Sequence, residues 1–257
     1  MSDHYNQPEL AELYDEENGW DVSADFYRDL GARIGARSLL DLGCGTGILT
    51  RGIAASLGCS AVGVDPAAPM LAVARCNTRD EAVAWIEGDA RTIRLGRRFD
   101  LIIMTGHAFQ GLVNAEDQAA VLRTIAKHLE PQGRFAFDSR NPEAREWLEW
   151  SPAESRRTIE TAAHGAVEIW NEANMREDGV TLDVVVHYRL LASGKSLRSD
   201  FRLRFTPQEE LGRAIAEAGL TVHDWFGAWD RRPFIATARE IIRVGGLAMN
   251  RFPYKPS

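Results

Sequence analysis

LLDLGCGTG, residues 39–47, is the stretch that decides the fold of this chain. An apolar run over residues 38–42 meets three glycines spaced one residue apart, and helix-forming sequence follows at once over residues 48–57. This order predicts a strand, a tight turn and a helix, because glycine lets the backbone turn sharply and lets a ligand approach without interference from a Cβ. The unpaired N–H groups at the helix start offer donors to an anion, and Asp41 can accept from an ammonium. An amino-acid zwitterion suits these groups better than a pyrophosphate does.

A second mark lies at the end of the next expected strand. VGVD, residues 62–65, ends in Asp65, where a β-α-β unit places a carboxylate against a ribose diol. More than one class of nucleoside cofactor uses such an acid, so the glycine spacing has to separate them. The spacing here is G-x-G-x-G, and Ile48 occupies the place of the third glycine in the dinucleotide fingerprint. The pattern disfavours a dinucleotide oxidoreductase, which stays an alternative that nicotinamide binding would reveal.

Residues 41–47, DLGCGTG, resemble the first motif of the class I S-adenosylmethionine-dependent methyltransferases. The resemblance covers residues 39–138 well and the rest of the chain loosely. It implies an α/β fold with a Rossmann-like, seven-stranded, mostly parallel sheet, helices on both faces and an antiparallel last strand. It also implies S-adenosylmethionine as cofactor, S-adenosylhomocysteine as its product, and in-line methyl transfer to a nitrogen or oxygen of a small molecule, as in glycine and amino-sugar N-methyltransferases.

The expected cofactor residues gather at the ends of three strands. Asp89 follows a third strand at residues 84–86, where an acid can accept from the adenine amino group while the N–H of Ala90 donates to a ring nitrogen. The resemblance puts Met70 near the adenine, although core packing explains that residue equally well. The full set of expected cofactor residues is Asp41, Gly43, Cys44, Gly45, Asp65, Pro66, Met70, Asp89, Ala90 and Met104.

The expected fourth strand, FDLIIM at residues 99–104, is apolar on both faces and delivers His107 to the carboxyl edge of the sheet. Methyl transfer from a sulfonium depends largely on alignment, and a general base matters chiefly when the acceptor must lose a proton. Imidazole can take that proton, so His107 is the candidate catalytic residue. The alternative is a histidine that caps a loop or binds the cofactor's carboxylate. The Asn-Pro-Pro-Tyr-like motif that the resemblance associates with base and amide methylation does not occur here.

Four further residues are candidates for the acceptor site. The resemblance implies an N-terminal Leu-Tyr-Asp stretch that covers the cofactor. Here it is residues 13–15, which makes Tyr14 a candidate and Trp20 a second one. Arg140, beyond the expected fifth strand, has the geometry to clamp an acidic substrate. Phe109 is the fourth candidate, as a wall of the pocket. The structural alternatives are helix docking for the two N-terminal aromatics, core packing for Phe109 and a surface salt bridge for Arg140.

From residue 152 to 205 the pattern changes from alternating strands and helices to strands alone. Turns at Asp178-Gly179 and Ser193-Gly194 predict an antiparallel meander of three or four strands, inserted after the fifth strand. TPQE at residues 206–209 predicts a helix capping box, and the aromatic and basic loop at 225–232 is expected to pack against the meander. We expect a single methyltransferase domain over residues 1–257, with N-terminal cap helices at 1–35, the cofactor-binding core at 36–150, the inserted strands at 152–205 and the rest of the core at 206–257.

The composition limits the binding partners and the cellular location that can be expected. The 257 residues are 45% hydrophobic, enough for a large core, and a formal charge of −7 argues against a strong grip on a nucleic-acid backbone. Cys44, Cys59 and Cys76 form no metal-binding spacing, so we expect no metal and a reducing cytoplasmic location. The small-molecule substrate is what the resemblance implies. No apolar run reaches the ~20 residues of a membrane span, and residues 1–5 lack a signal pattern. Monomer and homodimer stay open, as do a methyltransferase of RNA or protein and a non-catalytic S-adenosylmethionine-binding protein.

Overall fold

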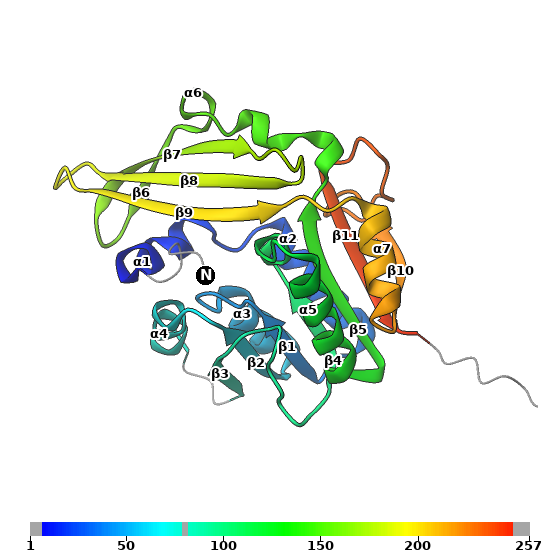
Figure 1. The fold of residues 1–257 in the computed structure, drawn as a ribbon. Coiled ribbons are helices and arrows are strands. Elements are labelled where there is room, and N and C mark those ends of the chain that lie inside the picture. Colours follow the sequence, from blue (N-terminus) through cyan, green and yellow to red (C-terminus); the bar gives the residue numbers. More distant parts are fainter. Residues whose placement is uncertain (1–6, 79–81, 249–257) are drawn as a thin grey trace, which may run out of the picture.

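The structure is a computed structural model that describes residues 7–78 and 82–248 (Figure 1). Residues 1–5, for which the sequence predicts no signal pattern, lie outside the described residues. Two sheets organise the chain, one of seven strands and one of four.

The central sheet has the strand order β10-β11-β5-β4-β1-β2-β3. The pairs among β1 to β5 are parallel, and β11 runs antiparallel to both of its neighbours, β5 and β10. The predicted Rossmann-like sheet with an antiparallel last strand is therefore confirmed. Its strands are β1 (Ser38–Leu42), β2 (Ser60–Asp65), β3 (Val83–Glu87), β4 (Phe99–Met104), β5 (Leu129–Arg140), β10 (Leu220–Phe226) and β11 (Glu240–Leu247).

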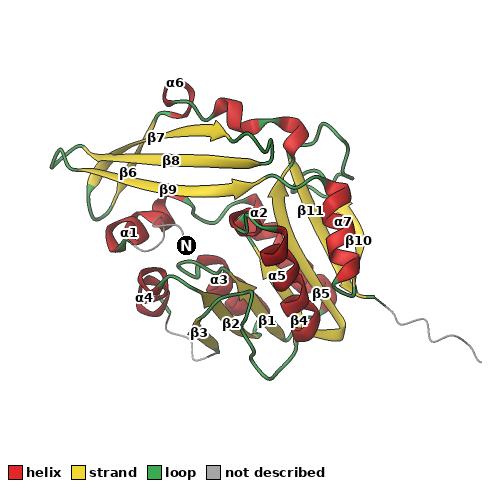
Figure 2. Cartoon of the chain, in the orientation of Figure 1, coloured by secondary structure: helices red, strands yellow, loops and turns green. Residues whose placement is uncertain are grey.

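Helices cover both faces of this sheet (Figure 2). Successive apolar side chains of β1 point to opposite faces of the sheet, so both faces need a covering layer. Leu39 packs in the cluster that contains Phe26 and Ile53, whereas Leu40 packs in the cluster that contains Val121. The first face is covered by α2 (Val22–Ile34) and α3 (Ile48–Leu57), and the second by α5 (Ala115–His128) and α7 (Gln208–Glu217).

The inserted segment forms the second sheet, in the order β6-β7-β8-β9, with every neighbouring pair antiparallel. This confirms the predicted meander, with four strands: β6 (Arg157–Thr161), β7 (Gly165–Met175), β8 (Thr181–Leu190) and β9 (Ser196–Arg204). Short helical segments precede it: η3 (Pro142–Ala144), η4 (Glu146–Glu149) and α6 (Pro152–Ser155).

The first helix, α1 (Pro8–Glu17), lies between the four-stranded sheet and α4 (Ala68–Cys76), as Figure 1 shows. Leu10 and Leu13 pack into the core of the four-stranded sheet, while Ala11 packs against Met70 of α4. Because apolar side chains leave α1 on two sides, the helix joins the insertion to the central domain.

Two local predictions are wrong. The residue before the first turn of α7 is Pro207, without a side-chain cap, and the Thr206 hydroxyl instead exchanges hydrogen bonds with Gln118. That pairing wins because Thr206 is buried and its hydroxyl must find a partner inside the protein. The loop at 225–232 does not pack on the meander as predicted, since Trp229 packs against Phe26 of α2 with ring centroids 5.7 Å apart.

Candidate functional site

The glycine loop is held in place by the end of β2. Gly43, Gly45 and Gly47 all have positive φ, which L side chains rarely adopt. The N–H groups of Gly43 and Cys44 donate to the Val64 carbonyl at 2.8 and 3.1 Å. The Gly45 N–H donates to Oδ2 of Asp65 at 2.9 Å. Backbone and carboxylate bonds thus fix the loop before any ligand arrives.

Asp41 presents an unpartnered acceptor beside this loop. Its Oδ2 accepts from the Thr50 hydroxyl at 2.6 Å, but its buried Oδ1 has no hydrogen-bond partner among the residues that the structure describes. Burial raises the pKa of Asp41 to about 7, the Thr50 hydrogen bond opposes that rise, and the nearby Asp65 adds to it. A buried acceptor without a partner is costly, so this oxygen fits a donor that a ligand brings.

The other two predicted acids already hold partners within the chain. Asp65 accepts from the Ala67 N–H at 2.8 Å as well as from Gly45, and burial raises its pKa. Asp89 receives two hydrogen bonds from Nε of Arg91, at 3.0 and 2.9 Å, and this guanidinium lowers the pKa of Asp89. Asp65 accepts one of these hydrogen bonds at each oxygen and so keeps a second lone pair on both. Each oxygen of Asp89 already accepts two, because Nη2 and the backbone N–H of Arg91 also donate to it. The ribose and adenine contacts expected of these residues stay predictions.

Helix α1 closes over the glycine loop through polar contacts. Asp15 accepts from the Thr46 hydroxyl and from Nη2 of Arg51, the latter at 3.2 Å. A Cβ placed on Gly45 would lie 3.7 Å from Cε1 of Tyr14, so the tyrosine ring covers the loop. Trp20 lies differently, against Gly52 of α3, with its indole N–H donating to Asp25 at 3.0 Å. These contacts account for Trp20, and we leave it out of the site.

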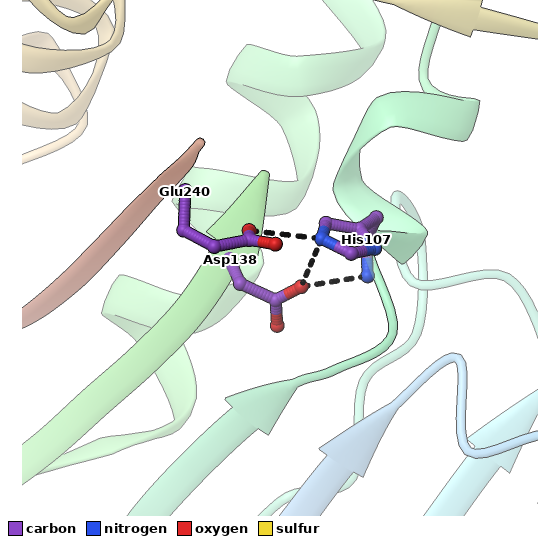
Figure 3. Close-up of side chains that lie close together, drawn as sticks. All are labelled: His107, Asp138 and Glu240. Carbon is purple, nitrogen blue, oxygen red and sulfur yellow. Dashed lines mark hydrogen bonds and ion pairs between the residues drawn. The ribbon is translucent and has the colours of Figure 1, made fainter. Parts of the chain in front are cut away.

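His107 meets two carboxylates at the carboxyl edge of the sheet (Figure 3). Its Nε2 lies 2.9 Å from Oε2 of Glu240, the first residue of β11, and 3.5 Å from Oδ2 of Asp138 on β5. The His107 backbone has φ 59° and its N–H donates to the same Oδ2 at 2.8 Å. The antiparallel β11 begins where β4 and β5 end, which is why residues far apart in the sequence converge here.

A buried network supports this cluster from behind. The Tyr27 hydroxyl of α2 donates to Oδ1 of Asp138, and burial, with the charge of that carboxylate, raises the pKa of the tyrosine. Arg243 on β11 is fully buried, donates from both Nη atoms to Ser139 Oγ at 2.9 Å, and lies over the Phe137 ring at 4.0 Å. Burial lowers its pKa to about 10, although Asp138 opposes that fall.

The ligand atoms of His107, Asp138 and Glu240 lie within 4.8 Å of one another, a spacing that a metal ion can use. The surroundings disfavour one. Both oxygens of Asp138 already accept hydrogen bonds, and the buried guanidinium of Arg243 supplies a positive charge next to it. A divalent cation would leave the cluster with excess positive charge in a buried place, whereas one protonated imidazole or ammonium balances it.

The remaining predicted residues divide between the loop and the core. Met104 lies against Gly43, with Cε 4.0 Å from where a Cβ would stand, and Cys44 lies against Gly63. Pro66 is exposed beside the end of β2, and Ala90 is partly buried. Phe109 is buried in the core, with its ring centroid 4.6 Å from that of Phe137, so we leave it out of the acceptor site.

Arg140 faces groups of the chain itself. Its Nη1 donates to Gln110 Oε1 at 3.3 Å, and its guanidinium lies 4.9 Å from the Trp150 ring centroid. Its buried Nε has no hydrogen-bond partner among the described residues, but it forms an ion pair with Oε1 of Glu146 at 3.8 Å. Gln110 also donates to the carbonyl of Arg204, the last residue of β9, at 3.2 Å. Gln110 belongs to η2 (Ala108–Gly111), directly after His107, so this bond ties the four-stranded sheet to the edge that carries the histidine.

A cavity of about 420 Å³ lies apart from these groups, between the first turn of α5 and strands β8 and β9. Neither His107 nor the glycine loop lines it. Sequence reasoning did not single out Asp138, Glu240, Tyr27 or Arg243 as site residues. The signal that could have found the first two is an acid near the end of the fifth strand and another at the start of the last strand, because these two positions meet when the strands pair antiparallel.

Comparison with known proteins assigns the family. A profile of a methyltransferase domain matches residues 39–133. The chain is 31% identical over 204 residues to the dTDP-3-amino-3,4,6-trideoxy-alpha-D-glucopyranose N,N-dimethyltransferase of Streptomyces venezuelae, which covers 73% of this chain and 76% of that protein. It is 28% identical over 225 residues to the dTDP-3-amino-3,6-dideoxy-alpha-D-glucopyranose N,N-dimethyltransferase of Streptomyces fradiae, covering 83% and 84%.

The solved structure of Streptomyces venezuelae DesVI superposes with a TM-score of 0.76 at 25% identity, covering 93% of this chain and 98% of its own length. Among the described residues, none of the helices has the length and apolar character needed to cross a membrane. The glycine loop, the orphaned oxygen of Asp41 and the order of the central sheet agree with this relationship. The chain therefore belongs to the class I S-adenosylmethionine-dependent methyltransferases and uses S-adenosylmethionine as its cofactor.

Proposed function

We propose that this enzyme methylates the amino group of a small molecule, and that the acceptor is a nucleotide-linked amino sugar. The observation that carries the proposal is the partly exposed imidazole of His107, which stands among carboxylates where strands of the central sheet end. A net negative edge attracts the ammonium of an amine acceptor, which a hydroxyl compound lacks. The named activities of the two Streptomyces relatives, both N,N-dimethyltransferases of dTDP-linked amino sugars, support the same class of acceptor.

The glycine loop and the three acids are the proposed cofactor site. When bound, S-adenosylmethionine supplies a methyl group on a sulfonium, which is already activated for transfer. The Asp41 Oδ1 without a partner takes the ammonium of the methionine part, Asp65 takes the ribose hydroxyls, and Asp89 with the Ala90 N–H takes the adenine. Gly43 and Gly45 admit the ligand to the backbone, while Cys44, Pro66, Met70 and Met104 line the site. Tyr14 covers the glycine loop, and Arg140 is the proposed partner for an acidic group of the acceptor.

The affinity for S-adenosylhomocysteine is expected to rise with pH because of Asp41. Burial raises the pKa of this carboxyl to about 7 in the cofactor-free protein, so it is mostly protonated at pH 6 and mostly ionised at pH 8. Only the ionised form pairs with the ligand's ammonium. The affinity should therefore rise about tenfold from pH 6 to pH 8, in proportion to the ionised fraction. Isothermal titration calorimetry at half-unit steps of pH measures this.

Asp41→Asn is the matched control for that titration, because the amide keeps the shape and does not ionise. Its affinity should be lower than that of wild type at pH 8 and nearly independent of pH across the range. If affinity for S-adenosylhomocysteine rose with pH as steeply in Asp41→Asn as in wild type, Asp41 would not be the group that binds the ligand's ammonium.

The raised pKa of Asp41 also has a consequence for folding. Folding raises the pKa of this carboxyl, so its contribution to the free energy of unfolding falls as pH rises from about 4 to about 7. The contribution of Asp41 should therefore make the cofactor-free protein unfold more easily at pH 7 than at pH 5.5.

A radiolabelled-methyl assay with paired acceptors tests the function. Each pair consists of a nucleotide-linked amino sugar and the same compound with a hydroxyl in place of the amine, and glycine, a free amino sugar and RNA are added to the panel. Label transferred to the amine but not to its hydroxyl twin supports the proposal. Label on RNA or on the hydroxyl compounds alone would refute it. Trp229 of the loop at 225–232 packs on Phe26 of α2, so this aromatic ring does not support the RNA alternative.

A further inference from the structure

Glu240 stands out among the groups around His107, because it is the carboxylate that remains partly exposed beside the imidazole. The side chains of His107 and Glu240 are 18% and 16% exposed, whereas that of Asp138 is 0% exposed. We propose that Glu240 is a positioning residue that holds the Nε2–H of His107, so that Nδ1 is the atom that takes a proton from the acceptor's ammonium. The proposal rests on the proposed function, because it names the atoms through which an amine acceptor is activated.

The tautomer follows from the 2.9 Å contact between Nε2 and Oε2 of Glu240. An ionised carboxylate can only accept, so the hydrogen of this bond belongs to Nε2. Neutral imidazole carries one N–H, which leaves the lone pair on Nδ1. Among the residues that the structure describes, none is hydrogen-bonded to Nδ1. The histidine is thus set to act as a base at one defined atom.

Asp138 cannot serve the same purpose in its present contacts. Its Oδ1 accepts from the Tyr27 hydroxyl and its Oδ2 accepts from the His107 backbone N–H. The buried guanidinium of Arg243 balances its charge. Asp138 therefore fixes the backbone at His107, in a left-handed conformation that an L residue adopts only when held there. Glu240 is left as the group that orients the ring and balances the charge it gains.

The step itself is a proton transfer that balances without another reactant. One N–H bond of the acceptor ammonium breaks, its electron pair stays on nitrogen, and the proton goes to Nδ1 of neutral His107. The imidazolium that forms keeps its Nε2–H on Glu240, and the two opposite charges face each other in a partly buried place. The amine nitrogen is left with the lone pair that an in-line displacement requires. A histidine oriented and charge-balanced by a carboxylate is a recurrent arrangement in enzymes that use a base.

The first test reads the imidazole directly, in protein without cofactor. Nitrogen-15 NMR of histidine-labelled protein resolves the tautomers, and His107→Asn identifies the signal among the 6 histidines. At a pH where His107 is neutral, we expect the hydrogen on Nε2 in wild type and in Glu240→Gln, whose amide oxygen can also accept. In Glu240→Ala we expect a mixture of tautomers. A wild-type signal with the hydrogen on Nδ1 would overturn the proposal.

The second test reads the pH dependence of the methylation of a good amine acceptor. Glu240→Gln should lower kcat about tenfold and Glu240→Ala about 100-fold, with KM for the amine within about twofold of wild type. The acidic limb of the kcat profile should move to lower pH in Glu240→Gln, because the neutral amide no longer stabilises the imidazolium. The other groups around His107, namely Asp138, Tyr27 and Arg243, are unchanged in this variant. Glu240→Asp keeps the charge and should recover part of the rate.

Glu172→Gln is the control, since Glu172 lies 3.2 Å from Nε2 of His187 on the four-stranded sheet and the change also removes a carboxylate beside a histidine. It should leave the profile unchanged. A Glu240→Gln enzyme with the wild-type profile would overturn the proposal, and so would loss of activity with a chelator that Mg²⁺ or Zn²⁺ restores, since that result makes the cluster a metal site. If no amine is methylated by wild type, the proposed function fails, and the NMR result still decides which nitrogen carries the hydrogen.

Discussion

Asp138→Asn is expected to lower the free energy of unfolding by about 3–5 kcal/mol, because it removes the largest opposite charge that acts on the buried Arg243 and disturbs the hydrogen bonds from Tyr27 and from the His107 backbone. The asparagine keeps the size of the side chain, so the loss reports charge rather than a cavity. Asp138 and Arg243 are both 0% exposed, and water cannot replace the lost partner. For a chain of this size the loss corresponds to a fall in Tm of about 6–20 °C, measured by calorimetry and urea unfolding.

Two further variants separate the buried charge from a general effect of removing a carboxylate. Asp183→Asn breaks exposed ion pairs with Arg176 and Arg202, and it should change stability by no more than about 0.5 kcal/mol. Arg243→Met in the Asp138→Asn background removes both charges and should recover much of the stability. A fall in Tm below about 2 °C for Asp138→Asn, or no recovery in the double variant, would show that the two groups do not balance each other.

The order of elements was open to prediction because it depends on local patterns. The strand at residues 99–104 is apolar at most positions and the glycine-rich stretch at 43–47 separates a strand from a helix, and both signals survive without knowledge of the rest of the chain. The same holds for the inserted strands, whose turns carry glycine at Gly179 and Gly194 with positive φ. The packing of the loop at 225–232 was predicted wrongly, because nothing in its sequence says which of two apolar surfaces it meets.

The predicted cofactor residues also depend on local patterns, since they lie within a few residues of strand ends in one β-α-β series, and their contacts with the cofactor stay predictions. The cluster around His107 does not depend on local patterns. Glu240 reaches it only because β11 enters the sheet antiparallel to β5, and Tyr27 reaches it only because α2 covers that face. Those placements depend on tertiary packing, and a separation of 133 residues between His107 and Glu240 leaves no local signal. A site whose residues meet only through long-range contacts therefore cannot be identified without the structure.

Gly47→Ala is expected to have the largest effect on cofactor binding. A Cβ at this position would lie 2.1 Å from Cη2 of Trp85, and the indole cannot move aside easily, because it also fills the space over Gly63 and donates to Thr78 at 3.1 Å. We expect a stability loss of about 2–5 kcal/mol from backbone strain and overpacking together. The displaced loop should weaken S-adenosylhomocysteine binding at least about tenfold, which is 1.4 kcal/mol.

The opposite end of α3 offers the control for this prediction. Gly58 has φ +62°, close to the +71° of Gly47, but a Cβ there meets nothing within 4 Å. Gly58→Ala should therefore carry the backbone strain alone, about 1–2 kcal/mol, and leave binding unchanged. Trp85→Leu should reduce the additional cost of Gly47→Ala to nearly that of Gly58→Ala, because the two changes share one contact. Equal losses for the two glycine variants in the wild-type background would mean that Trp85 does not shape the loop, and that strain alone explains why glycine is needed at this turn.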